Sequence, residues 1–312
     1  MTLKSIEICA GAGGQALGLE NAGFEHVALV EIEPPACETL RMNRPQWNVV
    51  EGDVHGFSAS GYRGKVDLLA GGVPCPPFSV AGKQLGSDDE RDLFPEALRL
   101  VAECDPRAVM IENVKGIFYP KFSEYREMIV GRLHDMGYET WWQLVQASDY
   151  GVSQLRPRAI LVGIKKPWSD HFVWPEPNEE PAPTVGELLH GEMAENGWSG
   201  ADEWASAADG IAPTLVGGSK KHGGADLGPT RSKKAWLELG VDGKGVADSA
   251  PGPDFEGVPR LTVRMAARVQ GFPVDWEFSG RKTAAYRQVG NAFPPPVAEA
   301  VGKAIKEALD AE

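Results

Sequence analysis

The sequence contains few cysteines, and their spacing suits neither a zinc site nor a disulfide framework. Four occur among 312 residues, at Cys9, Cys37, Cys75 and Cys104, and no two of them form a Cys-x-x-Cys pair. Disulfides stabilise mainly secreted proteins, and structural zinc sites need closely spaced ligands. We therefore expect a protein of the reducing cytoplasm that has no metal site.

Long hydrophobic runs are missing as well. No apolar stretch approaches the roughly 20 residues that a helix needs to cross a bilayer. The first five residues lead directly into an expected strand and leave no room for a signal peptide. The apolar fraction of 42% is ordinary for a globular protein. The composition therefore predicts no membrane partner, and one large domain with or without a smaller companion.

Positive charge is also scarce, since the formal net charge is −13. This value argues at first against a polyanionic partner. One glycine-rich segment differs, because between Gly217 and Lys234 it carries Lys220, Lys221, Arg231, Lys233 and Lys234 against only Asp226. A solvated surface loop is the simpler interpretation from charge alone, although such a segment could supply a basic face for nucleic acid.

The first half of the chain alternates strand and helix patterns. Short apolar or β-branched runs predict strands over residues 5–9, 27–31, 49–50, 66–70, 108–111, 140–145 and 159–164. Helical patterns between them cover residues 15–22, 35–42, 92–103 and 123–136. This order predicts an α/β fold with a doubly wound, mostly parallel sheet.

The composition changes after Lys166. Residues 167–259 are rich in proline, glycine, tryptophan and acidic residues and show weak periodicity, which is typical of a smaller, loop-rich domain. Short helices are expected again over residues 263–269 and 283–289, and a longer one over 295–309. We predict a catalytic domain over 1–166, a small domain over 167–274 and a return to the first domain over 275–312.

Three expected strands end in residues that could bind an adenosine-containing cofactor. The turn Gly11-Ala12-Gly13-Gly14 opens a helix and lets a ligand approach the backbone, although tight packing would also explain its glycines. Glu31 ends the second strand, where an acid can bind a ribose hydroxyl pair. Asp53 follows the third strand and could accept a hydrogen bond from an adenine amino group.

A thiol and a carboxyl group follow the next two strands. Cys75 stands between Pro74 and Pro76, which fix φ and remove backbone donors. On its own, such a cysteine is more often a small buried hydrophobe. Glu112 ends the apolar run over 108–111 and could equally pair with an arginine. Because ligands bind at the carboxyl ends of the strands in open α/β sheets, we expect both groups in one cleft.

A later block alternates polar side chains. Gln154, Arg156 and Arg158 project to one face if the segment is extended. The two arginines could form a structural ion-pair network, or they could hold a phosphate or a carbonyl oxygen.

Taken in order, these blocks resemble those of the DNA (cytosine-5) methyltransferase family, and the match runs through most of the chain. Residues 7–14 resemble its S-adenosylmethionine loop, Pro74-Cys75 with Phe78-Ser79 its nucleophile loop, and Glu112-Asn113-Val114 its acid triplet. The block at 154–158, the runs at 260–262 and 270–273, and Gln288-Val289-Gly290-Asn291 with Pro294-Pro295 match later family blocks. The unmatched residues 166–258 fall where the family has a variable target-recognition domain.

The resemblance implies a Rossmann-like class I methyltransferase of the prokaryotic or phage modification type, with S-adenosylmethionine as cofactor. Cys75 would attack C6 of a cytosine flipped out of duplex DNA, and Glu112 would protonate N3. Arg158 would bind O2, and Arg156 would brace the loop or a phosphate. The implied cofactor-binding residues are Cys9, Ala10, Gly11, Gly13, Gly14, Glu31, Ile32, Asp53, Pro74, Asn291 and Ala292. The implied DNA-binding residues are Ser79, Lys83, Gln154, Thr214, Leu215, Lys220 and Lys221.

Three positions depart from the family's usual pattern. Cys9 and Ile32 stand where the family often has aromatic residues around the adenine, so these walls of the site would be smaller. Pro76 stands where glutamine is common, which bears on how the nucleophile loop closes on DNA.

Other interpretations stay open from the sequence. One is a tRNA cytosine-5 methyltransferase of the same family, although the long segment between Lys166 and Arg260 favours a reader of duplex DNA. Another is a catalytically silent DNA-binding homologue, and a third is a small-molecule enzyme such as a dehydrogenase. The resemblance also implies a monomer, with a cognate restriction endonuclease as a candidate partner.

Overall fold

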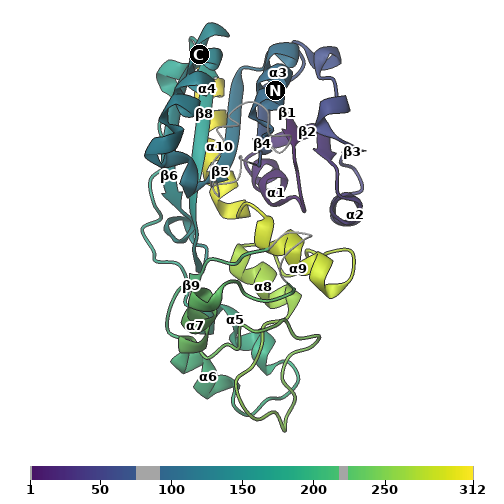
Figure 1. Ribbon diagram of the computed structural model, residues 1–312, viewed down its shortest axis with the longest axis vertical. Coiled ribbons are helices and arrows are strands. Elements are labelled where there is room, and N and C mark those ends of the chain that lie inside the picture. Colours follow the sequence, from purple (N-terminus) through teal and green to yellow (C-terminus); the bar gives the residue numbers. More distant parts are fainter. Residues whose placement is uncertain (1, 75–91, 218–223, 312) are drawn as a thin grey trace.

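A central sheet is visible in the computed structural model, which describes residues 2–74, 92–217 and 224–311. In this part of the chain, seven strands pair in the order β3-β2-β1-β4-β5-β8-β6 (Figure 1). They are β1 (Leu3–Ile8), β2 (Phe24–Glu31), β3 (Val49–Glu51), β4 (Leu68–Gly72), β5 (Ala108–Val114), β6 (Tyr138–Gln146) and β8 (Pro157–Lys165). The first five pair in parallel, whereas β8 runs antiparallel to both β5 and β6. The predicted doubly wound, mostly parallel α/β sheet is confirmed.

Helices cover both faces of this sheet because the strands are apolar on both sides. Ile6 and Ile8 of β1 pack in one buried cluster with α3 and α4, and Leu68 and Ala70 of β4 pack in another with α10. Helix α1 packs closely on α10, since an added Cβ on Gly18 would lie only 2.5 Å from Ala298 Cβ. The helices of this part are α1 (Gly14–Asn21), α2 (Pro34–Asn43), α3 (Phe94–Cys104), α4 (Ser123–Asp135) and α10 (Pro295–Asp310).

The remaining helices form the lower part of the molecule in Figure 1. They are α5 (Val185–Ala194), α6 (Ala201–Ala207), α7 (Thr230–Glu238), α8 (Val263–Gln270) and α9 (Lys282–Asn291). A two-stranded ladder, β7 (Gln154–Leu155) with β9 (Ala212–Pro213), joins this part to the start of β8. Three of these helices, α5 to α7, lie in the segment that the sequence predicts to be loop-rich.

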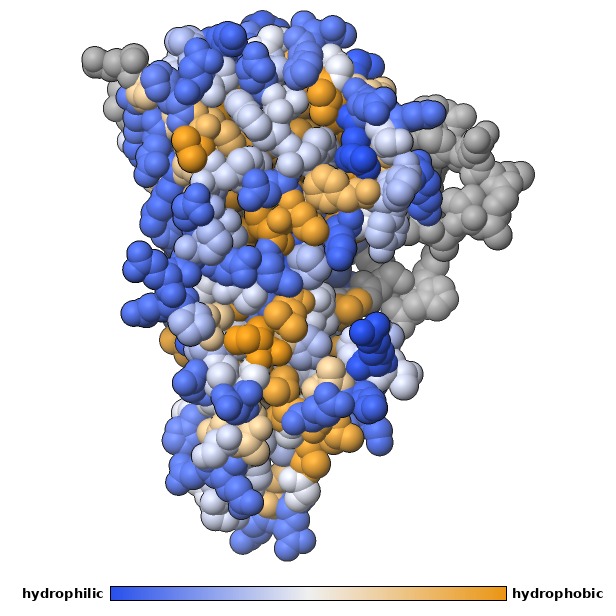
Figure 2. Space-filling model, turned by 90° about the vertical axis from the view of Figure 1, so that its left-hand side faces the viewer, coloured by the Kyte–Doolittle hydropathy of each residue, from blue (hydrophilic) through white to orange (hydrophobic). Residues whose placement is uncertain are grey.

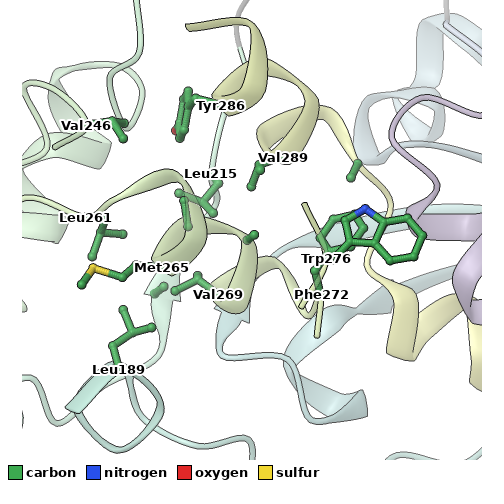
Figure 3. Packing of buried hydrophobic residues seen from close by; sticks show 14 of the residues in the cluster. Leu189, Leu215, Val246, Leu261, Met265, Val269, Phe272, Trp276, Tyr286 and Val289 are labelled. Carbon is green, nitrogen blue, oxygen red and sulfur yellow. The ribbon is translucent and has the colours of Figure 1, made fainter. Parts of the chain in front are cut away.

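Helix α8 is the centre of the lower core. Figure 3 shows Met265 and Val269 of α8 between Leu189 of α5 on one side and Tyr286 and Val289 of α9 on the other. The predicted domain boundary at residue 274 falls between α8 and α9, so the buried cluster continues across it. Trp276 extends this cluster toward the sheet, where its indole N–H donates to the Ala12 carbonyl at 3.2 Å.

Figure 2 shows polar residues over most of the surface on one side of the molecule, with apolar residues in groups along its length. Among the described residues, no helix combines the length and the apolar character that crossing a membrane requires.

Candidate active site

A cavity of about 390 Å³ lies at the carboxyl ends of the central strands, within the range typical of small-ligand sites. Residues that follow β1 form one wall, the end of β2 and the start of α2 a second, and α9 with the turn after it a third. Gly72 of β4 and Glu112 of β5 close the side that faces the remaining strands. The lining residues are Glu7, Cys9, Ala10, Gly11, Ala12, Gly14, Gln15, Glu31, Glu33, Pro35, Ala36, Gly72, Glu112, Ala284, Arg287, Gln288, Asn291, Ala292 and Phe293.

The glycine turn after β1 combines ligand access and tight packing. Gly11 has φ +54°, and an added Cβ would meet nothing within 4 Å, so its backbone borders open space in the cavity wall. Gly14 differs, because an added Cβ would overlap the Phe293 carbonyl oxygen. One glycine therefore supplies the turn at the cavity, and the other lets α1 approach the segment before α10.

Glu31 lies buried at the edge of this cavity. The backbone N–H of Gly11 donates to its Oε2 at 2.7 Å, and that of Glu33 donates to its Oε1 at 2.8 Å. Burial raises the pKa of this carboxyl, while the two N–H donors oppose that shift. The carboxyl group is thus held in one orientation, with lone pairs left to accept from a diol.

Cys9 forms a second part of the wall, in a left-handed turn with φ 53°. Burial, and then the nearby Glu31 carboxylate, raise the pKa of its thiol to about 12. A thiol with such a pKa stays protonated at neutral pH and is a poor nucleophile. Cys9 is therefore a small, inert wall residue.

Most of the cofactor-binding residues implied by the sequence line this cavity, and four do not. Gly13, Ile32, Asp53 and Pro74 are absent from the lining, although Cys9, Ala10, Gly11, Gly14, Glu31, Asn291 and Ala292 are present. Ile32 is 57% exposed, and the Asp53 carboxylate accepts from His55 Nδ1 at 2.7 Å. Both side chains are exposed near the same edge of the sheet as the cavity. Only a ligand that extends beyond the lining residues would contact them.

The sequence interpretation missed several lining residues. Glu7 and Gln15 are buried polar residues beside the glycine turn, and Arg287 is a cation from α9. An acid inside the apolar strand that ends at Ile8 was a usable signal, because an unpaired carboxyl group is costly in a core. Nothing in the local sequence distinguishes Gln15 or Arg287.

Glu112 and Arg158 form an ion pair at the edge of the cavity. Arg158 Nε lies 2.7 Å from Glu112 Oε1, and the two side chains are 12% and 13% exposed. In the sheet, Glu112 is opposite Ile160 and Val114 is opposite Arg158, so the pair is a diagonal contact between β5 and β8. Burial lowers the pKa of Arg158, and the Glu112 charge opposes this shift.

Cys75, the predicted nucleophile, and Pro76 lie outside the described residues. The strand end that leads to them is tied to the same site: Asn113 Nδ2 donates to the Val73 carbonyl at 3.0 Å. An added Cβ on Gly72 would lie 3.1 Å from Glu112 Oε2, so a glycine there leaves room for the carboxylate. The chain therefore leaves β4 beside Glu112.

Arg156 is fully buried and binds backbone carbonyl groups instead of an acid. Its Nη1 donates to Leu215 at 2.8 Å, and its Nη2 donates to Gly290 at 2.8 Å and to Ala292 at 3.0 Å. Burial, and then the nearby Arg158, lower the pKa of Arg156. A phosphate cannot reach a side chain that is 1% exposed. Of the two roles implied by the sequence, this position fits the bracing of a loop.

Some of the implied DNA-binding residues are buried, and others lie outside the described residues. Gln154 is fully buried, where it donates to Gln270 Oε1 at 2.7 Å and accepts from the Leu215 N–H at 2.9 Å. The Leu215 side chain is buried as well, and the Thr214 hydroxyl donates to the Leu155 carbonyl at 2.6 Å. Gln154 and Leu215 thus hold this segment from inside, and their direct contact with DNA stays a prediction. Ser79, Lys83, Lys220 and Lys221 lie outside the described residues.

A doubly wound sheet with a cofactor-sized cavity, a buried acid at the end of β2 and a carboxylate–arginine pair between β5 and β8 indicates an α/β enzyme of the methyltransferase class. The chain belongs to the family of C-5 cytosine-specific DNA methylases, whose family model matches residues 3–307. The family, the fold and the enzyme class expected from the sequence are confirmed.

Relatives that match the whole of this chain support the assignment. The chain is 58% identical over 315 residues to the type II methyltransferase M.NgoMIV of Neisseria gonorrhoeae, with all of both chains covered. It is 57% identical to the type II methyltransferase M.NaeI of Lentzea aerocolonigenes, covering all of this chain and 76% of that one. A prophage-encoded E. coli protein described as a DNA modification methyltransferase has a similar structure, with a TM-score of 0.70 and 27% identity over 99% of this chain and 100% of that one. These relatives favour a DNA methyltransferase over the RNA-modifying and silent alternatives.

Proposed function

We propose that this protein transfers a methyl group from S-adenosylmethionine to C5 of a cytosine in duplex DNA, at a specific sequence, through a covalent adduct of Cys75. The largely buried Glu112–Arg158 pair carries this proposal. It combines an acid that can protonate a ring nitrogen with a donor that can bind a carbonyl oxygen, at the edge of a cavity of cofactor size. A cytosine presents N3 and O2 side by side for such a pair.

The cavity fits S-adenosylmethionine in size and in chemistry. Glu31 would accept from the ribose hydroxyls, Cys9 would contact the adenine, and Asn291 would border the remaining wall. When bound, the cofactor supplies an electrophilic methyl group on a sulfonium. Four of the five charged lining residues are acidic, Glu7, Glu31, Glu33 and Glu112 against Arg287, which favours a ligand that carries positive charge.

The proposed reaction divides one difficult step into two easier ones. The Cys75 thiolate attacks C6, the C5–C6 π electrons form the C4–C5 double bond, and the C4–N3 π electrons move to N3, which takes the proton of Glu112. The C4–C5 pair would then bond C5 to the methyl group that the cofactor supplies, the methyl–sulfur bonding pair would stay on sulfur, and the N3 pair would restore the C4–N3 double bond. A base removes the C5 proton, its electron pair restores the C5–C6 double bond and expels the thiolate from C6, and N3 returns its proton to Glu112. Arg158 holds O2 throughout.

Duplex DNA would bind between the sheet and the lower helices, with the target base flipped into the site. Flipping costs a few kcal/mol, which contacts from the small domain would offset. Arg156 and Gln154 would hold the recognition segment at 214–215 from inside. A monomer, a cytoplasmic location and a cognate restriction endonuclease as partner complete the proposal, on the basis of the type II relatives.

The test is a methylation assay with matched variants. The protein is incubated with S-adenosylmethionine and duplex DNA of varied sequence, and 5-methylcytosine is mapped. Cys75→Ala should abolish methylation, and Glu112→Gln should reduce it by about 10²–10⁴-fold, the usual contribution of a general acid. Cys104→Ala is the matched control, because this thiol is buried at the end of α3 and does not line the cavity.

A substrate with 5-fluorocytosine tests the covalent step directly, because fluorine cannot leave C5 as a proton does. The wild-type protein should form a denaturation-resistant complex with this DNA, and Cys75→Ala should not. Methylation that persists unchanged in Cys75→Ala would refute the mechanism. Methylation of tRNA without methylation of duplex DNA would refute the proposed substrate.

A further inference from the structure

The cavity is acidic, although DNA, the proposed substrate, is a polyanion. Glu7, Glu31, Glu33 and Glu112 line it, and the whole chain has a formal net charge of −13. A phosphate group that approaches such a wall is repelled unless a cation offsets the acids. Among the lining residues that the structure describes, Arg287 is the one cation.

Arg287 is half-buried and has donors that nothing uses. A guanidinium carries five N–H donors, and within the described ranges no ion pair or side-chain hydrogen bond engages this one. Two acids of the same wall are occupied, since Glu31 is held by two backbone N–H groups and Glu112 pairs with Arg158. A half-buried arginine without a partner in a cavity wall points to an anionic ligand.

Helix α9 fixes the place of this side chain. The residues of α9 that line the cavity recur at i, i+3, i+4 and i+7, and Arg287 is the second of them. The opposite face of the helix packs in the lower core through Tyr286 and Val289 (Figure 3). Gln288 ties the helix to α2, because its Oε1 accepts from the Thr39 hydroxyl at 2.7 Å. Arg287 therefore lies at the boundary between the two parts of the molecule.

The segment that follows Leu215 packs on the backbone of this part of α9. An added Cβ on Gly217 would lie 2.5 Å from the Arg287 carbonyl oxygen, and one on Gly290 would overlap the Gly217 nitrogen. Glycine at both positions lets the two backbones touch. Under the proposed function this segment belongs to the part that reads DNA, so a strand that it holds would pass beside Arg287.

The geometry of a flipped nucleotide indicates which group of that strand would meet the guanidinium. A base that enters the cavity leaves its phosphates at the entrance, because the backbone stays joined to both neighbouring nucleotides. The planar guanidinium of an arginine matches a phosphate with two parallel N–H donors.

We propose that Arg287 binds a backbone phosphate next to the target cytosine and offsets the acidic wall as the base enters. This inference rests on the proposed function, since it assigns a contact to the proposed substrate.

Duplexes in which one phosphate is neutral test this contact. Each carries a sequence at which the methylation assay maps 5-methylcytosine, with a methylphosphonate in place of the phosphate on the 5′ or the 3′ side of the target. Fluorescence anisotropy measures binding without cofactor. The wild type should bind one of these duplexes about tenfold or more weakly than the native duplex, the effect of losing a hydrogen bond between charged groups. Arg287→Met should bind the native duplex about tenfold or more weakly than the wild type does, and should discriminate among the three duplexes by less than about twofold.

The salt dependence of binding gives a second readout. Loss of one phosphate contact in Arg287→Met should reduce the slope of log affinity against log salt concentration by about one. Arg287→Lys should keep the slope and part of the discrimination, because it retains the charge without the planar fork. The matched control is Arg132→Met, since Arg132 is exposed in the last turn of α4 and does not line the cavity. This control should keep both the slope and the discrimination of the wild type.

Two measurements on the protein without DNA exclude other roles of Arg287. The affinity of Arg287→Met for S-adenosylhomocysteine, measured by calorimetry, should stay within about twofold of the wild type, because the proposed contact is to DNA. Its thermal midpoint should stay at the wild-type level, because the guanidinium binds no group of the described protein.

The outcomes are distinguishable. Discrimination among the duplexes that is equal in Arg287→Met and wild type would overturn the contact. Weaker binding of S-adenosylhomocysteine would overturn it too, by assigning the guanidinium to the carboxylate of the cofactor, and a lower thermal midpoint would assign it to the fold. A wild type that methylates no duplex DNA would overturn the proposed function, and this contact with it.

Discussion

Replacing Arg156 by methionine should destabilise the protein strongly, although no acid pairs with this arginine. Its guanidinium is the hydrogen-bond donor to the Leu215 and Gly290 carbonyl oxygens, which lie in two segments far apart in the sequence. The Ala292 carbonyl keeps a second donor, Gln270 Nε2. Two buried carbonyls left unpaired, at about 1–3 kcal/mol each, predict a loss of roughly 2–6 kcal/mol. That is a large part of the usual stability of a domain, about 5–15 kcal/mol.

Urea unfolding would measure this loss for Arg156→Met and Arg156→Lys. The lysine variant should lose less, because an ammonium keeps the charge and some donors but not the planar fork. Arg41→Met is the matched control, since Arg41 pairs with Glu51 at 2.8 Å on the surface and such pairs contribute at most about 1 kcal/mol. A free energy of unfolding for Arg156→Met within about 1 kcal/mol of wild type would refute the bracing role.

Two further predictions concern packing and pH. Gly18→Ala should lower the free energy of unfolding by about 1–3 kcal/mol, because the added Cβ would overlap α10. The control Gly131→Ala in α4 meets nothing within 4 Å and should raise it by up to about 1 kcal/mol. Equal thermal midpoints of the two variants would contradict this prediction. Burial lowers the pKa of His26, so the unfolded chain binds the proton more readily, and stability should fall as the pH drops below about 6.5. Unfolding free energies at pH 7.5 and 5.5 should show this loss in wild type and less of it in His26→Gln; an identical pH dependence in the two proteins would exclude His26 as the cause.

The sheet could be predicted from the sequence because its strands are short apolar runs separated by clear helical patterns. The sequence does not predict α5 and α6 because they are short, with 10 and 7 residues, and because two glycines weaken the helical pattern of α5. One signal was present, since Thr184 and Glu187 form a capping box at the start of α5. Local chemistry therefore marked one helix where the hydrophobic pattern did not.

The sequence predicts the role of a site residue well when its position at a strand end decides that role. It predicts the role less well when the role depends on whether the side chain is buried. Glu31 and Glu112 follow apolar runs in β2 and β5, so their position at the cavity could be predicted from the strand pattern alone. Gln154 and Arg156 have the same residue types as exposed nucleic-acid contacts, and only the packing of the 215 and 290–292 segments around them shows that they are buried. Asp53 follows its strand as expected, yet its carboxylate binds His55.

The antiparallel direction of β8 explains why one short block serves both parts of the molecule. The other strands that border the cavity end at it, whereas β8 begins at that edge because it runs against β5. Arg158, the second residue of β8, therefore meets Glu112 near the end of β5. The residues just before β8 then lie between the sheet and the lower helices, where Arg156 reaches Leu215 on one side and Gly290 on the other. A parallel strand in this position would bring its carboxyl end to the cavity and carry the arginines to the opposite edge of the sheet.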